Sequence, residues 1–233
     1  RNIKKIGEKL NFFNSRLTSK NYFKILKNNF TKKFILENSG MLIGDKALYR
    51  QIKIYQILEK TKKVKGDIIE FGIWNGNNLF TIKKIVDYFN LKKKVVGFDN
   101  FEGFPNPVKL KKSKKGRYEG NPKKIQKIIK LFNLKNIKIF NDDIMNLSKY
   151  KNQFKKISFI YIDCNIYEPV KTILEQLSKK LSKGGVIAFD EAQHPIDKGE
   201  KKALIEFYRK NNKRFTLKFL KKNYQPDALL IKK

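Results

Sequence analysis

Cysteine, histidine and tryptophan each occur only once in this sequence of 233 residues. A single cysteine, Cys164, excludes an internal disulfide. No apolar run approaches the roughly 18 residues that span a bilayer, and the first residues lack the apolar core of a secretory signal. We therefore expect a cytoplasmic protein that has no membrane span.

Acidic residues are also scarce, since 21 Asp and Glu stand against 54 Lys and Arg and give a net charge of +33. A positive field attracts phosphates, so RNA or an anionic substrate is one explanation of this charge. The lysines are spread through nearly every segment, which favours the alternative of a solvated surface with a compositional bias. Because no aromatic-basic RNA motif is recognisable, nucleic acid is the less favoured partner.

Hydrophobic residues at 40% and aromatic residues at 13% suffice for a buried core. Residues 1–38 are basic and helical in character, with apolar side chains at three- and four-residue spacing between Ile3 and Phe13, and an amphipathic helix follows Gly40. We expect residues 1–60 to form a helical cap or lid extension. Residues 61–233 would then form one α/β domain, because domains of this class often reach such a length.

Apolar segments and helical segments alternate through the second part of the chain. The predicted strands cover residues 67–71, 94–98, 137–140, 157–162 and 185–190, with helices starting near Asn77, Pro122, Glu168 and Gly199. This alternation predicts a Rossmann-like, mostly parallel sheet with helices on both faces. Residues 214–220 and 228–231 add an antiparallel hairpin at one edge, so that the sheet has seven strands.

The first chemical motif is EFGIWNG, residues 70–76, at the end of the first predicted strand. Gly72 and Gly76 allow a sharp turn and a close approach to a ligand. Asp99 ends the next strand, where a carboxylate can accept both hydroxyls of a ribose. Asp142 follows the third strand, where it can meet an adenine amino group. A tight turn without a ligand is the alternative, but acids at successive strand ends favour a nucleotide-like ligand.

The second motif is a set of acids on later strands. Asp163 ends the fourth predicted strand, and Asp190 and Glu191 end the fifth. Three hard oxygen ligands at neighbouring strand ends can hold Mg²⁺, which would relieve their mutual repulsion. Helix caps and solvated loop acids are the alternative interpretation.

The chain resembles the macrocin O-methyltransferase (TylF) family from about Met41 to Phe207. The resemblance rests on the runs EFGIWNG, VVGFDNFEGFP, YIDCNIYEPV and GGVIAFDEAQHPIDKGEKKALIEF, which occur in the order and spacing of the family. It implies a class I methyltransferase fold and an S-adenosylmethionine-dependent O-methyltransferase that requires Mg²⁺. It also implies a carbohydrate or small-molecule acceptor, for which an anionic group would suit the positive charge.

The resemblance also assigns roles to individual residues. It implies that Asp163 is the catalytic base and a metal ligand together with Asp190 and Glu191. It places cofactor binding on the strand-end residues and on a residue of the lid, namely Glu70, Gly72, Gly76, Asp99, Asp142 and Met41. Two positions depart from the family, because Asn165 replaces the second acid of D-x-D-x-Y and Glu191 replaces the second Asp of D-D-Y.

Some expectations stay open at this point. These departures leave a non-catalytic scaffold as an alternative to the enzyme, and self-association into a homo-oligomer is also open. His194 is the next candidate for the base, although a histidine in a surface loop explains it equally well. Cys164 is expected to be a small buried side chain. The long basic loop at residues 105–121 is expected to act as a lid with Met41.

Overall fold

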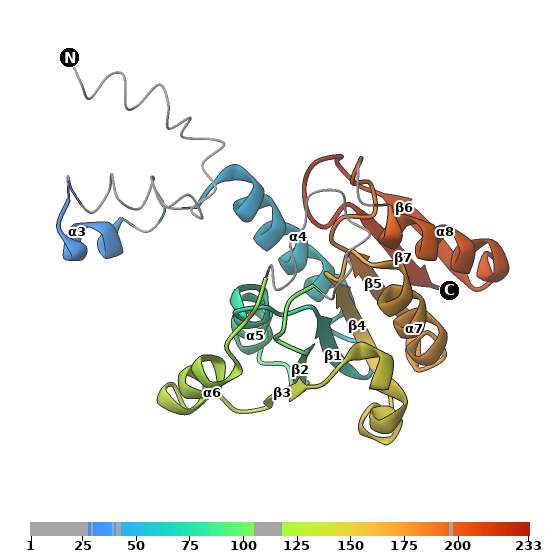
Figure 1. Cartoon of the computed structure of the whole chain (residues 1–233), viewed down its shortest axis with the longest axis horizontal. Helices are drawn as coiled ribbons and strands as arrows, with labels where there is room; N and C mark the ends of the chain where they lie inside the picture. The colour runs from blue at the N-terminus through green and yellow to red at the C-terminus, as the bar shows by residue number, and fades with distance from the viewer. Residues whose placement is uncertain (1–27, 29, 39, 41–42, 105–117, 196–197) are drawn as a thin grey trace, which may run out of the picture. The chain divides into compact units, whose positions relative to one another are not determined.

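The computed structural model describes residues 28, 30–38, 40, 43–104, 118–195 and 198–233 (Figure 1). The chain divides into two compact units, Arg1–Lys53 and Ile54–Lys233. In the first unit, Thr31 caps the short helix α3 (Lys32–Glu37) by accepting a hydrogen bond from Phe34 N. Residues 1–27 of the predicted helical extension lie outside the described residues. Met41 and residues 105–117, which belong to the predicted lid, lie outside them as well.

The second unit contains the seven-stranded sheet, whose strand order is β3-β2-β1-β4-β5-β7-β6. The first five strands are parallel, while β7 pairs antiparallel with both β5 and β6. The prediction of a mostly parallel sheet with a C-terminal hairpin at its edge is therefore confirmed. The strands are β1 (Asp67–Phe71), β2 (Val95–Asp99), β3 (Ile137–Asn141), β4 (Ile157–Ile162), β5 (Leu181–Phe189), β6 (Phe215–Phe219) and β7 (Ala228–Lys232).

The strand β5 begins at Leu181, earlier than the predicted start at residue 185. Its pairing with β4 shifts register, because Ile157 faces Leu181 whereas Phe159 faces Val186. Extra residues on one strand of a pair form a bulge, and Gly184 in this stretch has φ 77°. The glycines therefore mark a bulge inside the strand and not the turn before it.

Helices cover both faces of the sheet, as the alternation of buried residues along each strand requires (Figure 1). One face carries Ile69 and Phe71 of β1 and packs against the later helices; the other carries Ile68 and packs against the earlier ones. The later helices are η2 (Ile144–Gln153), α7 (Tyr167–Leu177) and α8 (Gly199–Asn211), and the earlier ones are α4 (Asp45–Thr61), α5 (Asn77–Tyr88) and α6 (Pro122–Leu131).

Parallel strands give the sheet two chemically different edges. The loops that follow β1 to β5, with residue 227 before the antiparallel β7, lie at what we call the carboxyl edge. The loops that precede β1 to β5 lie at the opposite, amino edge. In open α/β sheets ligands bind at the carboxyl edge, so we expect the functional site there. Within the described residues, no helix is long and apolar enough to cross a membrane.

Candidate functional site

The turn after β1 brings the first predicted motif against β4. Gly72 has φ 81°, and a Cβ atom placed on it would lie 2.0 Å from the carbonyl oxygen of Asp163. Gly72 N donates to Phe98 O at 3.0 Å, and Asp163 N donates to Phe71 O at 2.9 Å. Only glycine fits this turn, which holds the first motif beside the predicted base.

The helix α5 starts directly after this turn. Gly76 is its N-cap residue, has φ 81° and provides no side-chain hydrogen bond to the helix. The first amides of a helix need acceptors from outside it, so this end can receive polar ligand atoms. Asn78 Nδ2 donates to Glu70 Oε1 at 3.0 Å, and both side chains are buried. The motif is thus tied to the start of the helix, which fixes the direction of the turn.

Asp99 at the end of β2 links two loops of the carboxyl edge. Its Oδ2 accepts a hydrogen bond from Trp74 N at 2.8 Å, and its Oδ1 accepts one from Phe101 N at 2.7 Å. Burial raises the pKa of Asp99 above its usual value, while these amide donors act in the opposite direction. Each carboxylate oxygen can accept more than one hydrogen bond, so the arrangement leaves acceptor capacity for ribose hydroxyls.

Asp142 follows β3 and lies next to Asp99 along the edge, since Asp142 N donates to Asp99 O at 3.2 Å. Its Oδ1 accepts from Asn146 Nδ2 and its Oδ2 accepts from Tyr150 OH, both at 2.8 Å. These two hydrogen bonds lower the pKa of Asp142. The carboxylate is therefore held in its ionised form at the position where the sequence predicts contact with adenine.

The second predicted set of acids lies at the ends of β4 and β5. Asp190 is buried, and its Oδ1 accepts a hydrogen bond from Tyr161 OH. Glu191 is held from both sides: its Oε2 accepts from Asn165 Nδ2 at 3.0 Å and its Oε1 accepts from Gln225 Nε2 at 2.5 Å. The two positions that depart from the TylF-type motifs, 165 and 191, therefore contact each other.

Two further acids, which the sequence analysis missed, lie in the same place. Glu200 on α8 is 0% exposed, and its Oε1 accepts a hydrogen bond from Glu191 N at 3.1 Å. Burial, followed by the charges of Asp190 and Asp163, raises the pKa of Glu200 well above its usual value. Burial also raises the pKa of Asp227 to about 7. We call these two residues with Asp163, Asp190 and Glu191 the acid cluster.

The acid cluster gathers several carboxyl groups that act on one another, because, in addition to burial, the charges of Asp190 and Asp163 raise the pKa of Glu200 and those of Asp190 and Glu191 raise the pKa of Asp227. Among the described residues, Glu200 Oε2 and Asp227 Oδ1 are buried oxygens without a hydrogen-bond partner. Such an excess of hard oxygen donors suits a divalent cation. No three His, Cys, Asp or Glu side chains of the described part are arranged around one point as metal ligands, however. The donor set fits a cation in chemistry, and the predicted Mg²⁺ ligation stays a prediction.

The remaining candidates have simpler explanations in the structure. Cys164 is buried, and burial raises the pKa of its thiol well above the usual value, which confirms the expectation of a small buried side chain. His194 N donates to Glu191 O at 3.1 Å, so its backbone belongs to the loop after β5. Trp74 is 39% exposed and donates from its indole nitrogen to Glu119 O at 3.1 Å, so it covers the carboxyl edge and is not part of the core.

Comparisons with known proteins identify the family of the chain and solved structures with the same fold. A family model described as macrocin-O-methyltransferase (TylF) matches residues 39–217. The crystal structure of CalS11, a calicheamicin methyltransferase, is 22% identical with a TM-score of 0.73, covering 90% of this chain and 89% of that one. An apo structure of CalS11, described as a TDP-rhamnose 3'-O-methyltransferase, is 21% identical with a TM-score of 0.68 and covers 90% of both chains.

The O-methyltransferase NovP is a third similar structure, with 18% identity and a TM-score of 0.67, covering 82% of this chain and 81% of that one. At these identities the solved structures show a shared fold. No curated protein sequence matches the chain. The family model, which covers most of the chain, is therefore the comparison that bears on activity.

Proposed function

The chain belongs to the macrocin-O-methyltransferase (TylF) family and is an S-adenosylmethionine-dependent O-methyltransferase, and we propose that it methylates a hydroxyl group of a sugar at the acid cluster. The observation that carries the proposal is the contact of Gly72 with the carbonyl of Asp163. This contact brings the turn at residues 70–76, which we call the cofactor turn, next to Asp163 at the end of β4. A methyl donor and a proton acceptor can therefore meet the same hydroxyl.

The carboxyl edge supplies groups that suit each part of the cofactor. We assign the methionine part to the turn that contains Glu70, Gly72 and Gly76, the ribose hydroxyls to Asp99, and the adenine side to Asp142. The support is positional, because these residues lie at or directly after the carboxyl ends of β1, β2 and β3, which are neighbours in the sheet. The sulfonium group supplies a methyl that is activated for transfer. Closure of Met41 over the cofactor is part of the same proposal.

Transfer to an alcohol oxygen requires removal of its proton, because an alcohol is a poor nucleophile at neutral pH. The O–H bond breaks as the new O–CH₃ bond forms, the S–CH₃ bond breaks, and S-adenosylhomocysteine leaves as a neutral thioether. We propose that Asp163 accepts the proton at a carboxylate oxygen. Asp163 is half-buried at the strand end beside the cofactor turn, which supports this role.

A divalent cation, Mg²⁺ by the resemblance, completes the proposal. Asp163, Asp190 and Glu191 are the residues that would hold it, and the buried oxygens of Glu200 and Asp227 that have no hydrogen-bond partner support a cation at this place. A bound cation lowers the pKa of a coordinated hydroxyl. Asn165 and Gln225 each donate a hydrogen bond to Glu191, which supports a fixed position of this carboxylate.

The acceptor class is proposed from the family and from one similar enzyme. CalS11 is described as a TDP-rhamnose 3'-O-methyltransferase, and the family is named for methylation of macrocin. We propose a sugar that is attached to a nucleotide or to a larger glycoside. At the carboxyl edge the ring of Tyr118 contacts Trp74 and Phe104 edge to face, with ring centroids 5.7 and 5.5 Å apart. These rings offer the apolar faces that sugar rings prefer.

Calorimetry and a transfer assay test this function. The purified chain should bind S-adenosylhomocysteine more tightly than NAD, and Mg²⁺ should bind to the wild-type chain more tightly than to the Asp190→Asn variant. Labelled methyl groups should then appear on one of a set of nucleotide-linked deoxysugars. Tighter binding of NAD would contradict the cofactor, and transfer to RNA but to no sugar would contradict the acceptor class.

A further inference from the structure

The amino edge carries a dense group of lysines in the loops before β1, β2 and β3. Asp67 is the one acidic residue in residues 62–67, 89–94 and 132–136, and its Oδ1 accepts a hydrogen bond from a backbone amide, Lys94 N. No described residue forms an ion pair with the exposed lysines of these loops. We call them the lysine group: Lys62, Lys63, Lys65, Lys92, Lys94 and Lys135.

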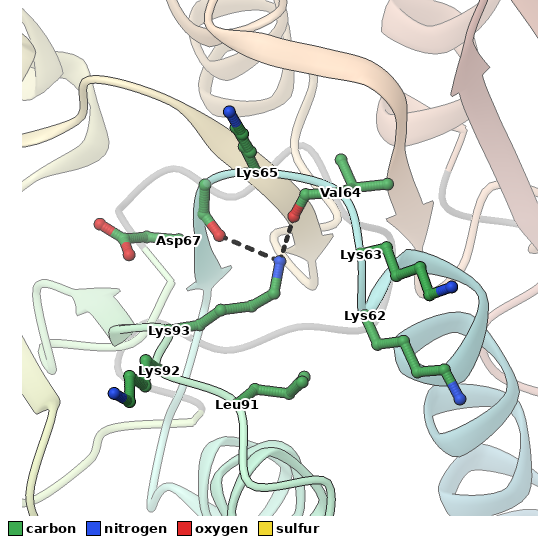
Figure 2. Close-up of a pocket in the computed structure, with 9 residues that line it drawn as sticks. Lys62, Lys63, Val64, Lys65, Asp67, Leu91, Lys92 and Lys93 are labelled. Atoms are coloured by element: carbon green, nitrogen blue, oxygen red, sulfur yellow. Dashed lines mark hydrogen bonds between the residues drawn. The ribbon is translucent and has the colours of Figure 1, made fainter.

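An open hollow of about 320 Å³ separates the loop before β1 from the loop before β2 (Figure 2). The side chain of Lys93 lies at the base of this hollow, because its Nζ points inward and donates hydrogen bonds to Val64 O and to Gly66 O. Figure 2 shows the other lysine side chains of the hollow pointing outward in different directions. Their ammonium groups do not converge on one point, so they suit an extended layer of negative charge better than a single small anion.

Exposed apolar side chains lie at the same edge. Tyr88 ends α5, Leu131 ends α6, and Phe132 follows Leu131; they are 72%, 71% and 67% exposed. The loops that follow these helices are adjacent, because Val95 N donates to Asn136 O at 2.8 Å. Single exposed apolar residues are common on protein surfaces. Three highly exposed ones beside six exposed lysines form a more specific combination.

We infer that the amino edge is a docking surface for a membrane rich in anionic phospholipid. Lysines near such a surface are attracted to the headgroups, and aromatic and aliphatic side chains enter the interfacial layer beside them. Lysine on its flexible stem suits a mobile layer of headgroups, whereas arginine is preferred where phosphates are bound in a fixed geometry. Leu131 has no ring on which a base could stack, whereas Tyr88, Leu131 and Phe132 can all enter the interfacial layer, so the three together fit lipid better than RNA.

Docking by this edge leaves the carboxyl edge open. The parallel strands β1, β2 and β3 separate the lysine group from the cofactor turn and from Asp99 and Asp142. The proposed site can then take up cofactor and acceptor while the opposite edge is on the membrane. The inference is independent of the acceptor and of the metal.

Sedimentation with vesicles tests the inference on the full chain. Vesicles of phosphatidylcholine with phosphatidylglycerol should bind the protein, vesicles of phosphatidylcholine alone should not, and added salt should weaken the binding. Joint substitution of Lys62, Lys63, Lys65 and Lys92 by Gln should lower the partition coefficient by about a hundredfold or more at low salt. The matched control replaces four exposed lysines elsewhere by Gln, namely Lys84, Lys127, Lys171 and Lys218.

The control variant carries the same net charge and should bind far more strongly than the amino-edge variant. A second variant, Leu131→Ser with Phe132→Ser, should weaken binding while it keeps every lysine, and thermal melting should show that it is folded. Equal losses in the amino-edge and control variants would overturn the inference, since binding would then follow net charge. Binding of RNA but not of vesicles would overturn it. It would also be overturned if the second variant converted a dimer to a monomer and left vesicle binding unchanged.

Discussion

Replacing Asn165 by Asp tests whether this residue positions Glu191. Asn165 has φ 57°, a conformation that Asp also tolerates, so the substitution changes the charge and leaves the backbone unstrained. It removes a hydrogen bond of 3.0 Å to a carboxylate, which contributes about 1.5–3 kcal/mol. It also puts two carboxylates together, which repel by up to about 4 kcal/mol at 4 Å unless a proton or a cation is taken up.

We expect the free energy of unfolding to fall by about 2–4 kcal/mol in metal-free buffer, which lowers the melting temperature by about 4–16 °C for a domain of this size. The double variant Asn165→Asp with Glu191→Gln should recover most of this loss. In that variant the new amide at position 191 can donate to the new carboxylate at position 165 and still accept from Gln225. Thermal melting of the single and double variants gives the coupling energy.

A cation at the acid cluster would offset part of this loss of stability. Mg²⁺ should restore part of the melting temperature of Asn165→Asp, because the variant offers one more oxygen ligand. The matched control is Asn146→Asp, which breaks a similar amide-to-carboxylate bond with Asp142 outside the acid cluster. Mg²⁺ should not rescue that control. An unchanged melting temperature for Asn165→Asp, or a double variant as unstable as the sum of the singles, would refute the positioning role.

Three other substitutions test the site. Gly72→Ala should lower the melting temperature and weaken binding of S-adenosylhomocysteine. The control Gly184→Ala has a similar φ of 77°, but its new Cβ atom would lie 3.4 Å from the nearest atom, so its melting temperature should fall less. Equal losses would contradict the close approach of Gly72 to Asp163. Asp163→Asn should lower turnover by about 10² to 10⁴ without changing the affinity for S-adenosylhomocysteine, and near-normal turnover would exclude it as the base. With a pKa of about 7 in the folded state, Asp227 makes the free energy of unfolding fall as the pH rises from about 4 to 7. Asp227→Asn should therefore flatten the dependence of the melting temperature on pH. Parallel profiles for the wild type and the variant would contradict the raised pKa of Asp227.

The fold could be predicted from the sequence because the central strands β1, β2, β4 and β5 are mostly apolar runs that end at a charged or small residue. Asp99 and Asp163 were located at strand ends by this rule, and the structure has them there. The start of β5 was missed because Gly184 and Gly185 resemble a turn. A glycine can bend a strand or end it, and the outcome depends on how the neighbouring strand pairs. The sequence of one segment alone does not determine this pairing.

Glu200 and Asp227 could not be found by the same rule. Glu200 is on a helix, and the available signal was its place three and four residues before Ala203 and Leu204, which are buried on the same face. Asp227 precedes β7, whose direction brings it to the carboxyl edge because Phe189 pairs with Ala228. Their proximity to Asp190 depends on tertiary packing of α8 and on the antiparallel hairpin, and neither has a local motif.

The net charge of the chain is a poor guide to the field at the site. Parallel strands sort loops by strand end, so the lysine group lies at the amino edge, while Asp99, Asp142 and the acid cluster lie at the carboxyl edge. Charges separated by more than a Debye length of about 8 Å are largely screened at physiological ionic strength. Among the described residues, the charges that add to burial in raising the pKa values of Glu200 and Asp227 are those of neighbouring carboxylates. An anionic group of an acceptor would be repelled by these carboxylates, so we expect the hydroxyl to be methylated to lie away from any such group.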